Sequence, residues 1–319
     1  MKIHFRSVVL LAFVATFLSA AGSIARAQSE QSTQVIGATY IAKSYLEVHA
    51  RGLVRTNEGE RFLTSESRLS FNRLTEAVPS HYSMRGIAGP VEDQGNCGSC
   101  WDFSLTSTLR GTLIMLASDP GRLSFNYLLN CATAMQACDG GDFPAAKLLT
   151  APAGAPAYGS DGPYVAAKGN CKSETPIAAA LDYHLLGEGS ANPSFKDLAL
   201  VMGVLHRPVT IDIVADSAFE SYSGGVFNGC SNYTADKINH MVTLEGYDCE
   251  SSIDENGNCV FDEKGNLPPG VGTWLIRNSW NATWGDQGYI TMKATDSNGQ
   301  RCNQAAYDAL YFDLKIKSK

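Results

Sequence analysis

The chain has 319 residues, of which 44% are hydrophobic and 18% are charged, so most of it should be globular and not disordered. Its length allows a sizeable core in one or two domains. A formal net charge of -7 and the lack of a long basic run argue against nucleic acid as the main partner.

The N-terminus has the pattern of a targeting segment. Lys2 and Arg6 precede a short apolar run over 7–21, and Ala25-Arg26-Ala27 then forms a cleavage pattern. We therefore predict a signal peptide over residues 1–27, the alternative being a retained membrane anchor. No later stretch has transmembrane length, so the mature chain is expected to be secreted into an extracellular, periplasmic or lysosome-like compartment, without a membrane partner.

Residues 28–77 contain no cysteine and little apolar patterning, and the composition changes at Val78-Pro79. We interpret this segment as a short propeptide, the alternative being an extension that stays attached. The nine cysteines are an odd number in an exported chain, so eight can pair and one can remain free.

After this boundary, helices come first and strands second. Ser99 can cap a helix over 100–116, with leucines at helical spacing. Further helices are expected over 124–130, 143–149 and 194–205, a loop over 151–169, and strands over 209–213, 241–247, 273–277, 288–293 and 309–316. This order predicts a helical half over roughly 90–190, a β half over roughly 191–319 and a cleft between them.

The candidate nucleophile lies in Gln94-Gly95-Asn96-Cys97-Gly98-Ser99-Cys100-Trp101. At a helix N-terminus the dipole favours negative charge, which should lower the pKa of the Cys100 thiol. Gln94 offers an amide donor for an oxyanion. The alternatives are structural cysteines or half a zinc site, but the chain has no second C-x-x-C and no suitably spaced histidine pair.

The base should be a histidine far downstream. Of the six histidines, His240 precedes an apolar strand, and 240 − 100 = 140 falls within the window of roughly 130–150 residues known for such pairs. Asn278, at the end of another strand, could orient the imidazole under Trp280. Its separation, 278 − 100 = 178, exceeds the window, which an insertion over 250–269 would explain.

These motifs, with Cys138-x-Gly140-Gly141, Asn239-His240 and Asn278-Ser279-Trp280, resemble the papain-like cysteine peptidases over about Val78 to Phe312. The resemblance implies an α+β fold with a helical left domain, an antiparallel β-barrel right domain and the active-site cleft between them. It assigns Cys100 as nucleophile, His240 as base, Asn278 as orienter and Gln94 as oxyanion donor. It places at the substrate Gly140, Gly141, Phe143, Asp212, Ile238, Asn239, Met241 and Trp280. It also implies the disulfides Cys97–Cys138, Cys131–Cys171 and Cys230–Cys302, leaving Cys249–Cys259 as an extra pair.

Three positions depart from the family pattern. Asp102 replaces the usual Ala; it should point away from the thiol because successive helix positions diverge by about 100 degrees. Asn281 replaces a Gly. Asp212 replaces Ala or Val, and either faces the substrate pocket or is a solvated carboxylate.

The expected function is that of a secreted cysteine endopeptidase made as a zymogen, acting through a thioester on peptide or protein substrates. It should need no cofactor or metal and should be a monomer. The alternatives are a catalytically silent member that binds peptides, and an exopeptidase whose cleft is limited by the 250–269 insertion. Titration of the thiol with an epoxide inhibitor would test for the silent member, and N-terminally and C-terminally blocked peptides would separate an endopeptidase from an exopeptidase.

Overall fold

The computed structural model describes residues 52–54, 68–71, 75–187 and 192–314, all within one compact unit, Tyr45–Lys319. The predicted signal peptide, residues 1–27, lies outside the described residues. Within those ranges, no helix is both long enough and apolar enough to cross a membrane.

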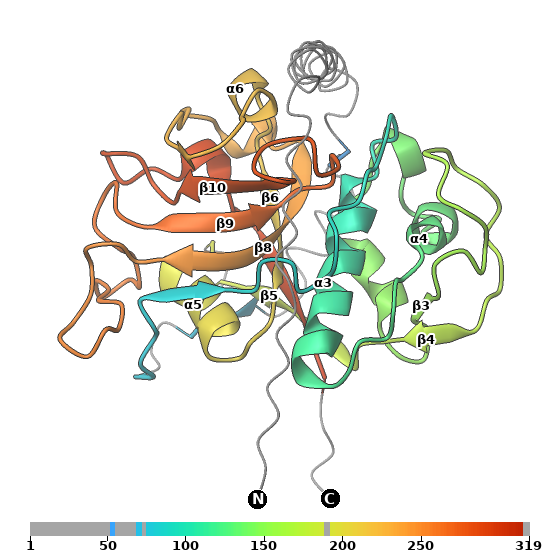
Figure 1. Ribbon diagram of the computed structural model, residues 1–319, viewed down its shortest axis with the longest axis horizontal. Helices are drawn as coiled ribbons and strands as arrows, with labels where there is room; N and C mark the ends of the chain where they lie inside the picture. The colour runs from blue at the N-terminus through green and yellow to red at the C-terminus, as the bar shows by residue number, and fades with distance from the viewer. Residues whose placement is uncertain (1–51, 55–67, 72–74, 188–191, 315–319) are drawn as a thin grey trace, which may run out of the picture. The chain divides into compact units, whose positions relative to one another are not determined.

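The helical half is built on α3, Cys100–Leu116 (Figure 1). The Ser124 side chain caps the next helix by accepting a hydrogen bond from the Tyr127 amide. The elements around α3 are α4 Phe125–Cys131, η1 Ala137–Asp139, η2 Phe143–Leu149, β3 Ala155–Pro156 and β4 Pro176–Ala178. They enclose one apolar core, which includes Leu105, Leu109, Leu128, Phe143 and Leu149.

The β half is a nine-stranded sheet with the strand order β1-β5-β11-β6-β8-β9-β10-β7, to which β2 is added on β8. Most pairs are antiparallel; β1 on β5 and β7 on β10 are parallel. The strands are β1 Arg68–Leu69, β2 His81–Ser83, β5 Asp182–Leu186, β6 Val209–Ile213, β7 Val226–Phe227, β8 His240–Asp248, β9 Thr273–Arg277, β10 Tyr289–Lys293 and β11 Ala309–Asp313. The short helices of this half are α5 Phe195–Gly203, α6 Ser217–Glu220, η3 Ala235–Lys237 and η4 Cys302–Gln304.

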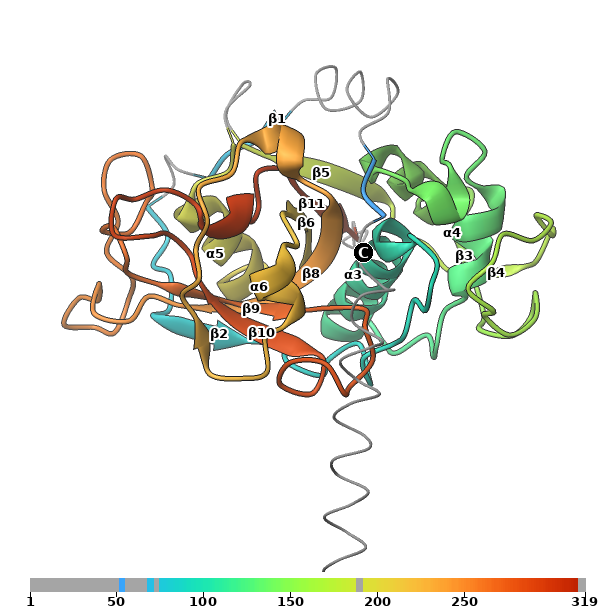
Figure 2. The same ribbon diagram turned by 90° about the horizontal axis from the view of Figure 1, so that it is seen from above.

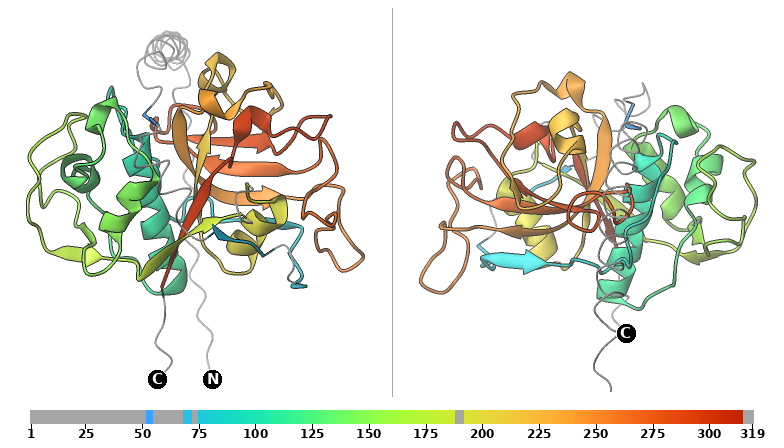
Figure 3. Two further views of the ribbon diagram at one scale, coloured as in Figure 1. Left: turned by 180° about the vertical axis from the view of Figure 1, so that it is seen from behind. Right: turned by 45° about the horizontal axis from the view of Figure 1, so that its top comes forward.

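The two halves meet along α3, which packs on β8 and β6 (Figures 1 and 2). Several contacts there are made by hydroxyl groups: Ser104 donates to the Val242 carbonyl at 2.7 Å, and the Thr108 and Thr210 hydroxyls lie 2.8 Å apart. We call the four hydroxyl-bearing residues Ser104, Thr108, Thr210 and Thr243 the hydroxyl seam. One apolar core lies within the β half, whereas the core around α3 also includes Met241, Leu310 and Phe312 of the sheet. Strand β11 passes from the sheet to the side of α3 (Figure 3).

The expected elements agree with the structure where the apolar pattern is strong. The predictions of helix 100–116 and of strands 209–213 and 273–277 are confirmed to the residue. The segment 143–149 is a 3₁₀-helix and not an α-helix; Pro144, in its first turn, lacks an N–H. Strand β5 lies in a segment that the sequence assigns to the helical half. Its residues, Asp-Tyr-His-Leu-Leu, lack the alternation of apolar and polar side chains that predicts a strand.

Candidate active site

Cys100 is the first residue of α3 and the one unpaired cysteine among the residues that the structure describes. It is fully buried, and the Met241 amide donates a hydrogen bond to its sulfur at 3.4 Å. Burial raises the pKa of the Cys100 thiol to about 12, against the opposing effect of backbone hydrogen bonds from Met241 and Gly52. The pKa of the covered thiol is therefore raised and not lowered as expected, because desolvation outweighs the backbone hydrogen bonds that favour the thiolate.

His240 begins β8, and Asn278 directly follows β9, the antiparallel neighbour of β8. Nε2 of His240 lies 2.8 Å from Oδ1 of Asn278. An amide oxygen can only accept, so Nε2 donates and the neutral ring carries no hydrogen on Nδ1. Among described atoms Nδ1 has no hydrogen-bond partner, and burial lowers the pKa of His240 to about 4. The imidazole is thus oriented with a free acceptor nitrogen.

Trp280 covers this pair from one side. Its ring stacks on the His240 ring at a centroid distance of 4.8 Å, and Phe219 and Trp284 meet it edge-on. The indole is almost fully buried, so the His240–Asn278 hydrogen bond is shielded from water. This arrangement matches the expectation for Trp280.

Gln94 is fully buried and is held between two loops. Its side-chain oxygen accepts from the Ser279 hydroxyl at 2.6 Å, and its side-chain nitrogen donates to the Cys97 carbonyl at 2.9 Å. Sequence reasoning missed Ser279 as the residue that fixes Gln94, although it stands in the same motif as Asn278. The amide donor thus lies beside the loop that leads into Cys100.

A short stretch from the predicted propeptide lies across the site. The Gly141 amide donates to the Gly52 carbonyl at 2.8 Å, the Val54 amide donates to the Gly141 carbonyl at 3.3 Å, and the Leu53 amide donates to the Asn239 carbonyl at 3.1 Å. Leu53 and Gly141 therefore pair as a parallel bridge. Nothing in the sequence around Gly52 marked this role, because three small or apolar residues carry no motif.

Gly140 leaves room for residues 52–54, and Gly141 leaves room for the Trp101 ring behind its own backbone. A Cβ on Gly141 would lie 2.4 Å from the Trp101 ring, and a Cβ on Gly140 would lie 2.5 Å from Val54. Gly140 also has a φ of +131°, which side chains rarely adopt. Backbone groups of any peptide lying here can therefore reach the Gly141 backbone.

The predicted pocket residues Phe143, Ile238 and Met241 are buried in the same apolar cluster as Leu53. Asp212 is also fully buried, and its Oδ1 accepts from the Asp308 amide at 2.8 Å. The alternative in which Asp212 is a solvated carboxylate is therefore wrong. Asp212 lies near the buried Arg301, where burial lowers the pKa of the Arg301 guanidinium and the interaction with Asp212 opposes that lowering.

Two of the departures have a local structural explanation. Asn281 has a φ of +52°, a left-handed conformation that Asn tolerates better than most residues after Gly. Asp102 is fully buried; its Oδ1 accepts from Thr106 at 3.1 Å, and its Oδ2 has no partner among described atoms. Burial raises the pKa of the Asp102 carboxyl well above its ordinary value.

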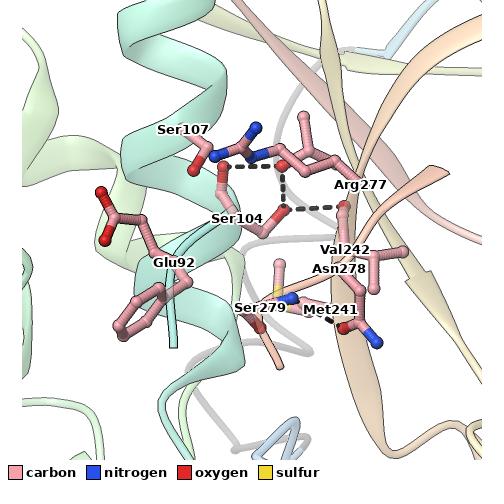
Figure 4. A pocket seen from close by; sticks show the side chains of 10 residues that line it. Glu92, Ser104, Ser107, Met241, Val242, Arg277, Asn278 and Ser279 are labelled. Carbon is pink, nitrogen blue, oxygen red and sulfur yellow. Dashed lines mark hydrogen bonds between the residues drawn. The ribbon is translucent and has the colours of Figure 1, made fainter. Parts of the chain in front are cut away.

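A small pocket lies behind the site, on the hydroxyl seam (Figure 4). Ser104, Ser107 and Arg277 line it together with Asn278, whose side-chain nitrogen has no partner among described atoms. Within the described ranges, no group of three or more His, Cys, Asp or Glu side chains is arranged to hold a metal ion.

The structure contains the disulfides Cys97–Cys138, Cys131–Cys171 and Cys230–Cys302, which the resemblance implies, and Cys249–Cys259, the expected extra pair. The first of them joins the loop before Cys100 to the loop that carries Gly140 and Gly141. It therefore holds the candidate nucleophile beside the peptide-binding backbone.

Comparison with known proteins agrees with this geometry. The model of the papain family of cysteine proteases matches residues 78–310. The chain belongs to the papain family of cysteine proteases. Its fold is accordingly the α+β papain fold, with the helices and the sheet described above.

Papain-family relatives include the probable cysteine protease RD21B of Arabidopsis thaliana, 30% identical over 69% of this chain and 43% of RD21B. The oryzain gamma chain of Oryza sativa subsp. japonica is 33% identical over 69% of this chain and 57% of its own length. The chain thus spans about half the length of these two curated relatives.

Among solved structures, the bromelain protease from Ananas comosus in complex with the E64 inhibitor is 30% identical, with a TM-score of 0.57 over 75% of this chain and 100% of bromelain. Procathepsin L2 from the Tenebrio molitor larval midgut is 25% identical, with a TM-score of 0.65 over 85% of this chain and 80% of procathepsin L2.

Proposed function

We propose that this papain-family protein is a secreted cysteine endopeptidase, made as a zymogen, that cleaves peptide bonds with Cys100, His240 and Asn278. The observation that carries the proposal is the hydrogen bond from His240 Nε2 to Asn278 Oδ1, which leaves Nδ1 free to take the thiol proton. Cys100 approaches the same strand, β8, through its hydrogen bond from the Met241 amide.

In this mechanism Nδ1 of His240 accepts the proton of Cys100, and the thiolate attacks the substrate carbonyl carbon. The Cys100 amide and the Gln94 side chain donate to the oxyanion. The amide C–N bond breaks as His240 returns the proton to the leaving amine, forming a thioester. Water, deprotonated by His240, then releases the carboxylic acid and restores the thiol.

The zymogen form is supported by residues 52–54, which use the backbone groups of Gly141 and Asn239 that a substrate would use. In this covered state the pKa of the thiol, about 12, and that of the imidazole, about 4, keep both groups neutral near pH 7. Removing residues 52–54 would return water to the site and let the thiolate–imidazolium pair form.

The substrate pocket is proposed to prefer apolar residues at the second position before the scissile bond, because Leu53 belongs to the same buried apolar cluster as Phe143, Ile238 and Met241. A role for Asp212 in this pocket stays a prediction. Substrates that differ only in Arg or Leu at that position would test it: an Arg-to-Leu ratio of kcat/KM that is the same in wild type and Asp212→Ala excludes Asp212 as a reader of substrate.

Export is supported by the four disulfides, which persist in oxidising compartments. Endopeptidase activity is supported by the position of the 250–269 insertion. Residues 257–259 of this insertion contact Val78 and Ser80, near the end of β8 opposite to His240, a position that favours an open cleft over the exopeptidase alternative.

The test uses the chain from Gln28, before and after trimming. The trimmed enzyme should hydrolyse peptides blocked at both ends and be labelled at Cys100 by an epoxide inhibitor of the E64 type, and Cys100→Ser should lower kcat by at least about a thousandfold. The uncut chain should label slowly. A trimmed, folded protein that binds peptides without cleaving them would instead identify the silent homologue, and cleavage of only terminally free peptides would identify an exopeptidase.

A further inference from the structure

The Tyr164 hydroxyl contacts both ends of the loop that leads into Cys100. Tyr164 lies between β3 and β4, and its side-chain oxygen is 2.8 Å from the Gln94 carbonyl oxygen and 2.7 Å from the Ser99 hydroxyl oxygen. We call residues 94–99 the oxyanion loop. A single oxygen atom of Tyr164 therefore ties the first residue of this loop to the last.

The direction of these two hydrogen bonds follows from their partners. A carbonyl can only accept, so the one hydrogen of the Tyr164 hydroxyl goes to Gln94. Toward Ser99 the Tyr164 oxygen must then accept, and Ser99 donates to it at 2.7 Å rather than to the Cys97 carbonyl at 3.4 Å. Burial raises the pKa of Tyr164 above its ordinary value of 10.0, and the nearby Asp102 adds to this, so the hydroxyl keeps its hydrogen near neutral pH.

Tyr164 is itself fixed by the helical half. Its ring meets the ring of Phe103, on α3, edge-on at a centroid distance of 5.0 Å. The side-chain nitrogen of the buried Asn126, on α4, donates to the carbonyls of Gly162 and Pro163 at 2.9 and 3.0 Å. The chain is thus held directly before Tyr164, and the tyrosine ring is held by packing, so the hydroxyl is a fixed point for the oxyanion loop.

The oxyanion loop positions both donors that the proposed mechanism gives to the oxyanion. One is the Gln94 side chain, and the other is the Cys100 amide, which directly follows Ser99. Such donors stabilise the transition state only when they lie at hydrogen-bond distance from the place where the oxyanion forms. The Ser279 hydroxyl holds the Gln94 side-chain oxygen, and the Tyr164 hydroxyl holds the Gln94 backbone carbonyl.

We propose that Tyr164 is a positioning residue for peptide-bond cleavage, which sets the distance between the Gln94 and Cys100 donors through its hydrogen bonds to Gln94 and Ser99. The inference rests on the proposed function and names a residue that touches neither the substrate nor the reacting atoms. Its loss should therefore lower kcat and leave both the KM for peptides and the reactivity of the thiol nearly unchanged.

The first experiment compares Tyr164→Phe with Tyr127→Phe in the trimmed enzyme. Both changes remove a hydroxyl from a half-buried ring on the same apolar core, but the Tyr127 hydroxyl makes no hydrogen bond to another described residue. Tyr164→Phe should lower kcat about tenfold to a hundredfold, with KM within about twofold, because a displaced donor costs less than a missing one. Equal kcat values for the two variants would overturn the proposal.

A second readout separates the oxyanion donors from the nucleophile. Iodoacetamide forms a bond between the Cys100 sulfur and a saturated carbon and releases iodide, so no oxyanion develops. The alkylation rate of Tyr164→Phe should stay within about twofold of wild type while its kcat falls. A matching fall in the alkylation rate would show that Tyr164 supports the thiol or the whole fold, and would overturn its assignment as a positioning residue for the oxyanion donors.

Gln94→Ala shows whether Tyr164 acts through Gln94. In the Gln94→Ala background, Tyr164→Phe should lower kcat by a smaller factor than it does in wild type, because one of the two donors that it positions is already gone. An equal factor in the two backgrounds would mean that Tyr164 acts independently of Gln94, against the proposal.

Amide hydrogen exchange separates failure of this inference from failure of the proposed function. If trimmed wild type hydrolyses no peptide, the proposed function fails, and exchange in the uncut chain tests Tyr164 by itself. The Cys97 amide donates to the same Gln94 carbonyl at 3.4 Å, so it should exchange faster in Tyr164→Phe than in Tyr127→Phe. Equal rates in the two variants would show that Tyr164 does not hold the loop.

Should Tyr164→Phe not fold, Ser99→Ala removes the other hydrogen bond of the same Tyr164 oxygen. It should lower kcat several-fold in the trimmed enzyme, again with KM within about twofold. An unchanged kcat in folded Ser99→Ala would contradict the coupling of the two loop ends.

Discussion

Asp102 is a fully buried carboxyl group in the first turn of α3, the helix that begins with the candidate nucleophile Cys100. Its one unpartnered oxygen and full burial favour the neutral form, so the pKa of its carboxyl is raised above the ordinary value of 3.8. Below about pH 4 the native and unfolded chains both hold this proton. Above that pH the unfolded chain releases it and the native chain keeps it, so the free energy of unfolding falls as pH rises.

We therefore expect Asp102→Asn to be more stable than wild type at pH 8, with the difference growing from pH 4 by up to about 1.4 kcal/mol per pH unit until the native carboxyl ionises. Urea unfolding of both proteins at pH 4, 6 and 8 measures this. Parallel stability curves for the two proteins would mean that Asp102 is already ionised in the folded state.

A methyl group is enough to disturb the peptide-binding backbone. In Gly141→Ala the new Cβ would meet the Trp101 ring at 2.4 Å, so the loop must shift. We expect a stability loss of about 1–3 kcal/mol and a raised KM for peptides. Gly169→Ala is the control, because its Cβ would approach no atom closer than 3.3 Å, on an exposed loop. Peptide kinetics and thermal unfolding that do not differ between the two variants would argue against this role of Gly141.

At the scale of elements, α5 and the predicted propeptide share one carboxylate. Asp197 forms a capping box with Ser194, accepting through Oδ2 from the Ser194 amide at 2.8 Å, while its Oδ1 accepts from Ser70 and Phe71. Docking of residues 70–71 therefore uses a group that also fixes the start of a helix.

Ser194→Ala should lower stability by about 1 kcal/mol through loss of the cap, to a similar extent before and after trimming. Asp197→Ala should cost more in the uncut chain than in the trimmed enzyme, since only the former also loses the contacts of Ser70 and Phe71. Guanidinium unfolding of each variant, as the uncut chain and as the trimmed enzyme, measures the free energy of unfolding. If Asp197→Ala lowers this free energy equally in both, Asp197 does not also hold Ser70 and Phe71.

Sequence reasoning was most successful where local patterns are strong. The bounds of α3 are as the leucine spacing predicts, but Ser99 makes no side-chain cap; its hydroxyl lies 2.7 Å from that of Tyr164. His240 was chosen by its spacing from Cys100, and Asn278 by its place at the end of a strand. The surroundings of Asp212 could not be predicted, because Asp308 and Arg301 reach it only through the tertiary fold. Residues 52–54 carry no motif, since backbone groups alone make their contacts and any residues could supply them.

At the scale of the whole molecule, the proposed catalytic groups come from different parts of the fold. Cys100 belongs to the helical half, His240 and Asn278 to neighbouring strands of the sheet, and Gln94 to the loop between β2 and α3. Disulfides stay within local loops or within one half, and none of the four joins α3 to β8. The alignment of thiol and imidazole therefore depends on non-covalent packing between the halves.

Because of the hydroxyl seam, we expect parts of the molecule to unfold at different temperatures. Hydroxyl contacts exchange for water at a net cost of only about 1 kcal/mol each, whereas exposing the apolar core within the β half costs much more. Heat should therefore loosen the contact of α3 with β8 before the core within the β half melts, and Cys100 and His240 would lose register while the strands persist. Peptidase activity of the trimmed enzyme, assayed at each temperature of a ramp, should thus vanish several degrees below the far-ultraviolet circular dichroism transition; coincident midpoints would show that seam and cores give way together.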